Sequence, residues 1–186
     1  MTRSTDRNQR GEATPVVKST KESQLRAATR RGDVEEAERL LKAGAKIDAR
    51  TEIGFNSDGN SALDIAVADR KPEIAELLLE RGADPNQPNG RGRFPLDEAI
   101  KNGDLNLVAI LIKRGASAVG MADSMLTLLH SAARHGRLKM CRILVEGEGG
   151  VDINAKTKGG ATPLAVAVAN KRTRVVRYLR SKGAVE

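Results

Sequence analysis

The sequence predicts an all-α solenoid: five stacked helix–turn–helix units with β-turn or hairpin fingers between them. A leucine followed by alanine two or three positions later recurs at spacings of 38, 33, 33 and 35 residues, so the period centres on 33. Aromatic residues make up only 2% of the chain, which favours close packing of short helices by alanine and aliphatic side chains. The leucines of this marker are Leu25, Leu63, Leu96, Leu129 and Leu164, and a Gly-Ala pair follows at Gly44, Gly82, Gly115 and Gly183.

One unit illustrates how each helix pair is encoded. In residues 61–82, apolar residues mark two separate helical faces, which indicates two short helices. Pro72 is placed in the first turn of the second helix, where a missing N–H costs nothing. Gly82 ends that helix in a left-handed conformation. A single pair buries little surface, so its stability must come from stacking on its neighbours. The two faces are Leu63, Ala66 and Val67, then Ile74, Leu77 and Leu78.

These motifs resemble the ankyrin-repeat family, over about residues 22 to 186. The family opening, Thr-Pro-Leu-His-x-Ala, is matched by Thr162-Pro163-Leu164 with Ala167, by Phe94-Pro95-Leu96 with Ala99, and by Leu129-His130 with Ala132. The family close is matched by 82–86, Gly-Ala-Asp-Pro-Asn. The expected units are about 22–50, 51–88, 89–121, 122–156 and 157–186.

Three departures from the family pattern carry structural expectations. The inter-helix turn glycine is replaced by Arg70 and Lys171, whose turns we expect to be strained or differently wound. The finger at 51–59 is lengthened and contains Phe55, which either contacts a partner or folds back onto the first unit. A glycine-rich stretch at 146–150 predicts a flexible joint.

Residues 1–20 are expected to form a flexible basic arm, separate from the repeat domain at 21–186. The arm has hardly any apolar residues and cannot offset the entropy of ordering. Reading it as an organelle transit peptide is the alternative, against which Asp6 and Glu12 argue. No secretory leader or membrane span is evident, and the single cysteine fits a reducing compartment. We therefore expect an intracellular, cytoplasmic protein.

Enzymatic chemistry is not predicted. Cys141 lies beside apolar residues of a second helix and reads as a packed thiol, and His130 matches a family histidine that implies a structural role. With His135 as the only other histidine, no zinc site is arranged. The glycine-rich stretches lack the Gly-Lys-Ser/Thr ending of a phosphate loop. We expect no catalytic residue, no metal and no cofactor.

The excess of basic over acidic side chains lies entirely in the second half of the chain. The formal net charge is +8; residues 1–92 hold 16 basic and 16 acidic side chains, whereas 93–186 hold 16 and 8. Much of the excess lies in the last predicted helix, as a stripe that is either a solvated cap or a surface for a polyanion. Its residues are Lys171, Arg172, Arg174, Arg177, Arg180 and Lys182.

The resemblance implies a second candidate surface, the concave face formed by finger tips and first-helix ends. The charged residues at the corresponding positions are basic apart from one acid. This predicts an acidic or hydrogen-bond-rich partner. The residues at these positions are Arg30, Arg31, Phe55, Asp69, Arg91, Arg93, Lys101, Asn102, Arg134, His135, Lys156, Lys158 and Asn170.

Three functions follow as hypotheses. The first is a protein-binding scaffold or adaptor that recognises an acidic partner through the concave face, as a monomer or a subunit of a hetero-complex. The second is a structural subunit that docks on RNA or another polyanion through the C-terminal helix, although the lack of rings disfavours base stacking. The third is a dedicated enzyme inhibitor, which would share the first mechanism.

Overall fold

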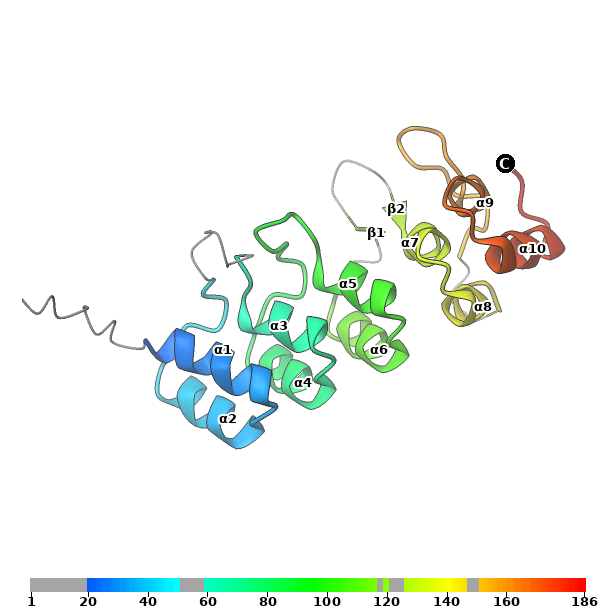
Figure 1. The fold of residues 1–186 in the computed structure, drawn as a ribbon. Helices are drawn as coiled ribbons and strands as arrows, with labels where there is room; N and C mark the ends of the chain where they lie inside the picture. Colours follow the sequence, from blue (N-terminus) through cyan, green and yellow to red (C-terminus); the bar gives the residue numbers. More distant parts are fainter. Residues whose placement is uncertain (1–19, 51–58, 117–118, 121–125, 147–150) are drawn as a thin grey trace, which may run out of the picture.

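The computed structural model describes residues 20–50, 59–116, 119–120, 126–146 and 151–186. Within these ranges the chain forms helix pairs that stack side by side into an elongated solenoid (Figure 1). Two short antiparallel strands, β1 (Val119–Gly120) and β2 (Leu126–Thr127), lead into the fourth pair. The helices are α1 (Lys21–Arg31), α2 (Val34–Lys42), α3 (Ala62–Ala68), α4 (Pro72–Glu80), α5 (Pro95–Asn102), α6 (Leu105–Lys113), α7 (Leu128–Arg134), α8 (Leu138–Glu146), α9 (Pro163–Ala169) and α10 (Thr173–Ser181).

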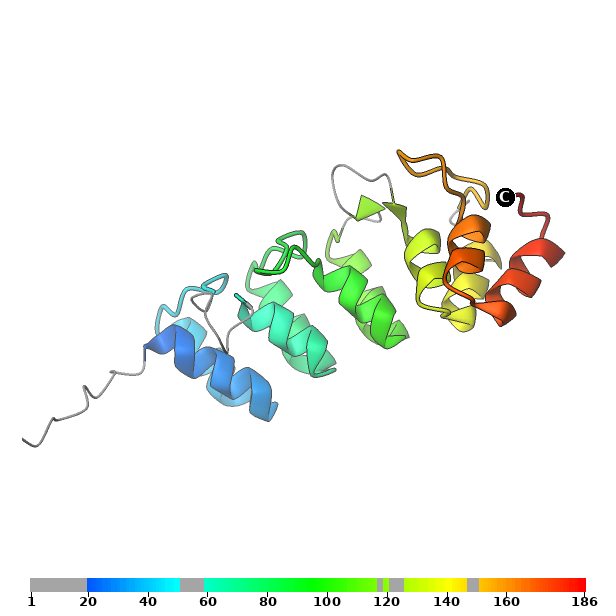
Figure 2. The ribbon, with the colours of Figure 1, turned by 45° about the horizontal axis from the view of Figure 1, so that its top comes forward.

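The predicted all-α ankyrin-type solenoid is confirmed. The first helix of each pair lies in one layer and the second helix in another, and the described loops between units, 81–94 and 151–162, project from the same side of the stack (Figures 1 and 2). These two loops therefore lie on one side of the stack, beside the first helices.

Side-chain caps fix where the helices begin. The Ser61 hydroxyl accepts a hydrogen bond from the Asp64 N–H, and the Asp64 carboxylate accepts one from the Ser61 N–H in return. The Thr162 hydroxyl accepts a hydrogen bond from the Ala165 N–H and caps α9, and Pro72 occupies the first position of α4, as predicted. Burial raises the pKa of the Asp64 carboxyl, which the hydrogen bonds from Ser61 oppose.

Thr20 belongs to the folded domain. Its hydroxyl accepts a hydrogen bond from the Ser23 N–H at 3.2 Å and caps α1. Thr20, the last residue of the expected arm, is therefore the N-cap of α1. The rest of the arm, 1–19, lies outside the described residues.

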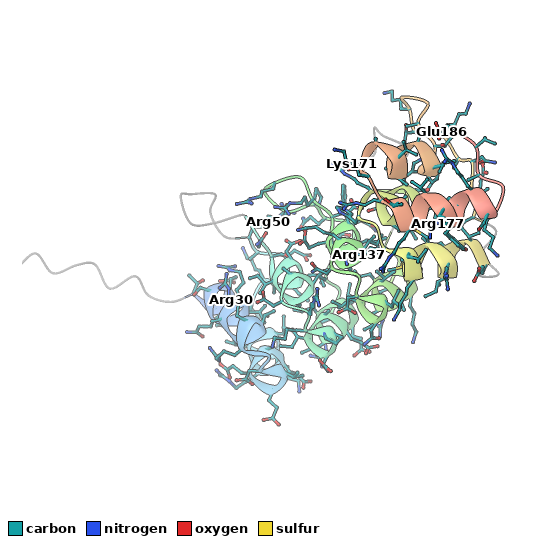
Figure 3. All side chains as sticks on the ribbon, turned by 45° about the vertical axis from the view of Figure 1, so that its right-hand side comes forward. Arg30, Arg50, Arg137, Lys171, Arg177 and Glu186 are labelled. Carbon is teal, nitrogen blue, oxygen red and sulfur yellow. The ribbon has the colours of Figure 1, made fainter. Side chains whose placement is uncertain are left out.

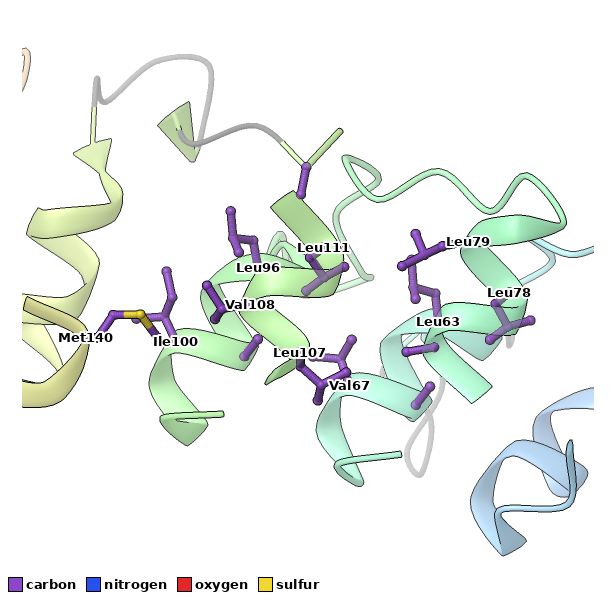
Figure 4. Close-up of a cluster of buried hydrophobic side chains, with 14 of the residues drawn as sticks. Leu63, Val67, Leu78, Leu79, Leu96, Ile100, Leu107, Val108, Leu111 and Met140 are labelled. Carbon is purple, nitrogen blue, oxygen red and sulfur yellow. The ribbon is translucent and has the colours of Figure 1, made fainter. Parts of the chain in front are cut away.

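Alanine in the first helices lets neighbouring pairs approach closely. At least one alanine of each first helix is completely buried, at an equivalent position, and the second helices fill the space behind with leucine. Figure 4 shows two contacts across unit boundaries, where Val67 points toward Leu107 and Ile100 toward Met140. The buried alanines are Ala28, Ala66, Ala99, Ala132 and Ala167.

The two turns that lack glycine do adopt a strained conformation, as expected. Arg70 has φ 54° and Lys171 has φ 56°, and no other non-glycine residue in the described ranges has a positive φ. Gly103 holds the same position in the third unit with φ 72°. Each unit requires a left-handed backbone conformation at this position. Two units have a residue with a side chain there, although a side chain disfavours this conformation.

Candidate partner-binding surface

The finger before α5 holds two of the expected contact residues. The Asn89 side-chain oxygen accepts hydrogen bonds from the N–H groups of Arg91 and Arg93, each at 3.0 Å, and the Asn89 N–H donates to the Arg93 carbonyl at 2.8 Å. Such an Asx-centred turn rigidifies the finger tip. Arg91 is exposed and Arg93 is half-buried.

Glu98 neutralises part of the expected basic face. Its carboxylate accepts from the Arg93 guanidinium at 3.3 Å and from the Lys101 ammonium at 2.7 Å. The Glu98 side chain is only 20% exposed, so it lies between the two cations. Our sequence reasoning missed this acid, although the i, i+3 spacing of Glu98 and Lys101 indicates such a pair.

A small cleft of about 80 Å³ opens next to this cluster, between α3 and α5. It is lined by Asp64, Asn89, Arg93 and Glu98 among other residues. Its polar walls suit a hydrogen-bonding side chain of a partner and are too confined for a drug-sized ligand.

The cations of the finger before α9 are exposed and unpaired within the described residues. The Thr157 N–H donates to the Ala161 carbonyl at 2.9 Å, and the Ala161 N–H donates back to the Thr157 hydroxyl at 3.1 Å. Lys156 and Lys158 flank Thr157 and are both exposed. Neither forms an ion pair with any described residue.

The first-helix ends differ from unit to unit. Arg30 and Asp69 are exposed, whereas Arg31 lies 3.8 Å from the Asp33 carboxylate. The Asn102 carbonyl accepts from Arg70 at 3.1 Å, so this residue serves a contact between units. Asn170 donates its side-chain amide to the Val166 carbonyl at 2.8 Å.

Arg134 and His135 end α7. Arg134 is exposed and forms no ion pair within the described ranges. Burial lowers the pKa of the His135 imidazole, and the neighbouring Arg134 lowers it further. His135 is therefore mainly neutral near pH 7, and the positive charge here belongs to Arg134.

The C-terminal basic stripe divides into engaged and free residues. Arg180 pairs with Glu186 at 2.6 Å, and Lys182 pairs with Glu146 of α8 at 3.1 Å. Arg172 donates through Nε to the Arg134 carbonyl at 2.9 Å. Arg174 and Arg177 are exposed and form no ion pair with the residues that the structure describes.

Lys171 does not belong to the helical stripe. It lies in the turn before α10, which begins at Thr173, because its left-handed backbone breaks the helix. Figure 3 shows Lys171 and Arg177 in the last helix pair, at the opposite end of the stack from Arg30. Phe55 and the glycine-rich stretch 147–150 fall outside the described residues.

Cys141 and His130 have the structural environments that the sequence predicts. Cys141 is fully buried in α8, and burial raises the pKa of its thiol to about 12. His130 is also fully buried; Nδ1 accepts from the Thr127 N–H at 3.2 Å, and Nε2 lies 3.0 Å from the Ala161 carbonyl. Burial lowers the pKa of this imidazole, so it remains neutral. The ring thereby connects α7 to the finger of the next unit.

The described residues contain neither a cluster of metal-binding side chains nor a helix suited to cross a membrane. No group of three or more His, Cys, Asp or Glu side chains is arranged there to hold a metal ion. None of the helices in those ranges combines the length and apolarity that a bilayer crossing needs.

Comparison with known proteins matches this repeat architecture. A family model described as Ankyrin repeats (3 copies) matches residues 7–89 and 96–185. The B-cell lymphoma 3 protein homolog of Mus musculus is 39% identical over 128 residues, 68% of this chain and 28% of the relative. The E3 ubiquitin-protein ligase XBAT32 of Arabidopsis thaliana is 32% identical over 187 residues, 86% of this chain and 36% of the relative.

A third relative is the nuclear factor NF-kappa-B p105 subunit of Gallus gallus, 28% identical over 164 residues, 86% of this chain and 16% of the relative. The chain thus corresponds to less than two fifths of the length of each of these relatives.

Stacked helix pairs of this kind define the class, which is a helical-repeat scaffold for protein interactions. The chain belongs to the ankyrin-repeat family.

Proposed function

We propose that this protein holds an acidic protein partner on the loop-and-first-helix face of its fourth and fifth units. The observation that carries the proposal is the pairing of the expected cations. Arg93 and Lys101 of the third unit share Glu98, whereas Arg134, Lys156 and Lys158 form no ion pair with any described residue. Unpaired, exposed cations attract an acidic surface at long range and set its orientation.

The proposed binding surface is therefore smaller than the concave face that the sequence predicts. A partner that approaches the third unit meets a carboxylate between two cations and gains little attraction there. One that approaches the last two units meets lysines and an arginine that no acid of the described chain neutralises. The burial of the Cys141 thiol and the buried, hydrogen-bonded state of the His130 imidazole support a scaffold role for this unit.

A charge-reversal experiment tests this proposal. The pair Lys156→Glu and Lys158→Glu should abolish salt-sensitive capture of partner proteins from nuclease-treated lysate, quantified by mass spectrometry. The matched control is Lys113→Glu with Lys139→Glu, which makes the same charge change at exposed positions on second helices. Equal capture by both double variants would refute binding of the partner at the finger before α9.

Docking on a nucleic acid is the second candidate, favoured by the free Arg174 and Arg177 on α10. Binding to a phosphate backbone needs cations and no aromatic rings. Retention of labelled poly(U) RNA should then fall steeply with salt and disappear in the Arg174→Glu, Arg177→Glu variant. Unchanged retention in this variant, or no retention by the wild type, removes this candidate.

A further inference from the structure

The boundary between the third and fourth units is open on the side of the second helices. At the other three boundaries the second helices pack along one another: α2 on α4, α4 on α6, and α8 on α10. Between α6 and α8 the contact is at most marginal, and Figure 1 shows these two helices spread apart. We call this the α6–α8 boundary.

Two isoleucines are exposed at the α6–α8 boundary. Ile112 of α6 is 42% exposed and Ile143 of α8 is 54% exposed. At the other boundaries the large apolar residues in these two positions are buried or half-buried. They are Leu41, Leu79 and Val145 at the position of Ile112, and Leu77, Ile110 and Tyr178 at the position of Ile143.

The neighbouring boundaries show which way these side chains face. Ile110 of α6 lines a cleft together with residues of α4, so its equivalent Ile143 faces α6. The Tyr178 hydroxyl, at the same position of the fifth unit, donates to the Glu146 carboxylate near the end of the preceding second helix at 3.3 Å. Ile143 therefore faces the C-terminal half of α6, which contains Ile112.

An ion pair between units is also missing at this boundary. At the other three boundaries, the cation that follows a second helix pairs with an acid of the preceding second helix. These pairs are Arg81 with Glu38 at 2.5 Å, Arg114 with Glu80 at 2.6 Å, and Lys182 with Glu146 at 3.1 Å. In α6 the positions of these acids are occupied by Ala109 and Lys113. The attraction that holds the other second helices together is therefore absent here.

Like charges take its place. Lys113 is exposed at the end of α6. On α8, exposed Lys139 lies one helical turn before Ile143, and exposed Arg142 directly precedes it. None of these cations forms an ion pair with the described residues, and Glu146 of α8 is already paired with the cation after α10. Closing the boundary brings Lys113 toward the two cations of α8, and their repulsion opposes closure.

The first-helix side of the same boundary remains packed. The Ser131 hydroxyl of α7 donates to the Asp97 carboxylate of α5 at 3.0 Å, and the Arg137 guanidinium donates to the Lys101 carbonyl. Ile100 of α5 is fully buried there. These contacts form a pivot, and the separation of α6 from α8 lies on the opposite side of it.

We propose that the α6–α8 boundary is a hinge that closes when salt screens its cations. Repulsion between Lys113 and the cations of α8 favours the open form, and burial of Ile112 against Ile143 favours the closed form. Closure turns the fourth and fifth units, which carry the proposed partner surface, relative to the first three. The inference goes beyond the proposed partner binding and does not depend on it.

Double electron–electron resonance on the full chain tests the hinge. Spin labels are attached at Glu73→Cys in α4 and Thr173→Cys in α10, both exposed positions. The background is Cys141→Ala, since alanine occupies this position in the first two units. We expect the distance between the labels to shorten by several ångströms when NaCl is raised from about 20 mM to about 500 mM, because charges are then screened beyond about 4 Å.

Three variants separate the two opposing forces. Lys113→Glu should give the short distance already at low salt, because it restores the acid that α4 and α8 have at this position. The matched control is Lys42→Glu, the same charge change at the equivalent exposed position of α2, which should leave the distance long. Ile143→Gln removes apolar surface from the boundary and should abolish the shortening by salt.

A second pair of labels, at Glu35→Cys in α2 and Glu73→Cys, lies within the first two units and should not respond to salt. Thermal unfolding checks that every variant remains folded. Four results would each overturn the proposal: a distance that salt does not change, a Lys113→Glu distance no shorter than that of Lys42→Glu at low salt, unchanged shortening in Ile143→Gln, or an equal response of the second pair. No partner is present, so a failure here leaves the lysate test of the partner surface unaffected.

Discussion

Lys171 holds a backbone conformation that a side chain disfavours. Its φ of 56° lies in the left-handed region, where Cβ crowds the following carbonyl. The Lys171 N–H donates to the Val168 carbonyl at 2.9 Å, so the turn itself is formed normally. The side chain is exposed and forms no ion pair in the described chain, so glycine would lose little there.

We therefore expect Lys171→Gly to stabilise the protein by about 0.5–1 kcal/mol, since relief of strain exceeds the added entropy of the unfolded chain. Urea unfolding measures the difference. Lys171→Ala removes the same charge and keeps Cβ, so it should bring no gain. If the alanine variant proves at least as stable as the glycine variant, the turn is not strained.

The period of the sequence predicts such residue-level features well and side-chain pairing less well. The repeat register identified the strained turns at Arg70 and Lys171 and the proline in the first turn of α4, and the family resemblance implied the structural role of His130. These follow from backbone position, which every unit repeats.

The ion pairs could not be derived in the same way. Glu98 accepts from Lys101 within α5, but it accepts from Arg93 only because the finger folds back toward this helix. Glu146 reaches Lys182 across a unit boundary. Long side chains at equivalent positions have different neighbours, and the repeat pattern does not specify which neighbour each one contacts.

At the scale of elements, arginine side chains connect the ends of first helices in adjacent units. Arg70 donates to the Asn102 carbonyl at 3.1 Å, Arg172 donates to the Arg134 carbonyl at 2.9 Å, and the Arg137 guanidinium donates to the carbonyl of Lys101. Each places a cation at a helix C-terminus, where the last carbonyls lack partners and the dipole is negative. Arg172, expected to bind a polyanion, thus has a structural contact.

Replacing Arg137 by methionine isolates this effect. Methionine keeps an apolar stem beside Gly103 and leaves the Lys101 carbonyl without its charged donor. The expected loss is about 1–2 kcal/mol of unfolding free energy, measured in urea. Lys139→Met, at an exposed position two residues further along the chain in α8, should change stability by only a few tenths of a kcal/mol. An equal effect of both substitutions would show that the contact contributes nothing.

At the scale of the whole molecule, the described part of the repeat domain begins at Thr20. Replacing residues 1–19 by a single methionine should leave the thermal midpoint unchanged. Removing Thr20 as well should cost about 1 kcal/mol, because α1 loses its cap, and should lower the midpoint by a few degrees. Thr20→Ala in the full chain should reproduce the second result. A clear loss of stability on removal of 1–19 alone would mean that the arm packs on the stack.

The coverage of each unit by its neighbours is a whole-molecule property that the period does not predict. Val168 is 42% exposed, whereas its equivalents Val67 and Ile100 are buried between units. The period predicts which residues occupy equivalent positions in the units. The exposure of each residue also depends on the units packed beside it, which the period does not specify.

The single thiol offers a way to observe motion within the stack. Cys141 is the only cysteine, is fully buried, and its raised pKa disfavours the reactive thiolate. An alkylating reagent can therefore reach it only when α8 separates from its neighbours. The rate of labelling in native buffer would report how often the fourth unit opens, and its dependence on urea would distinguish local opening from global unfolding.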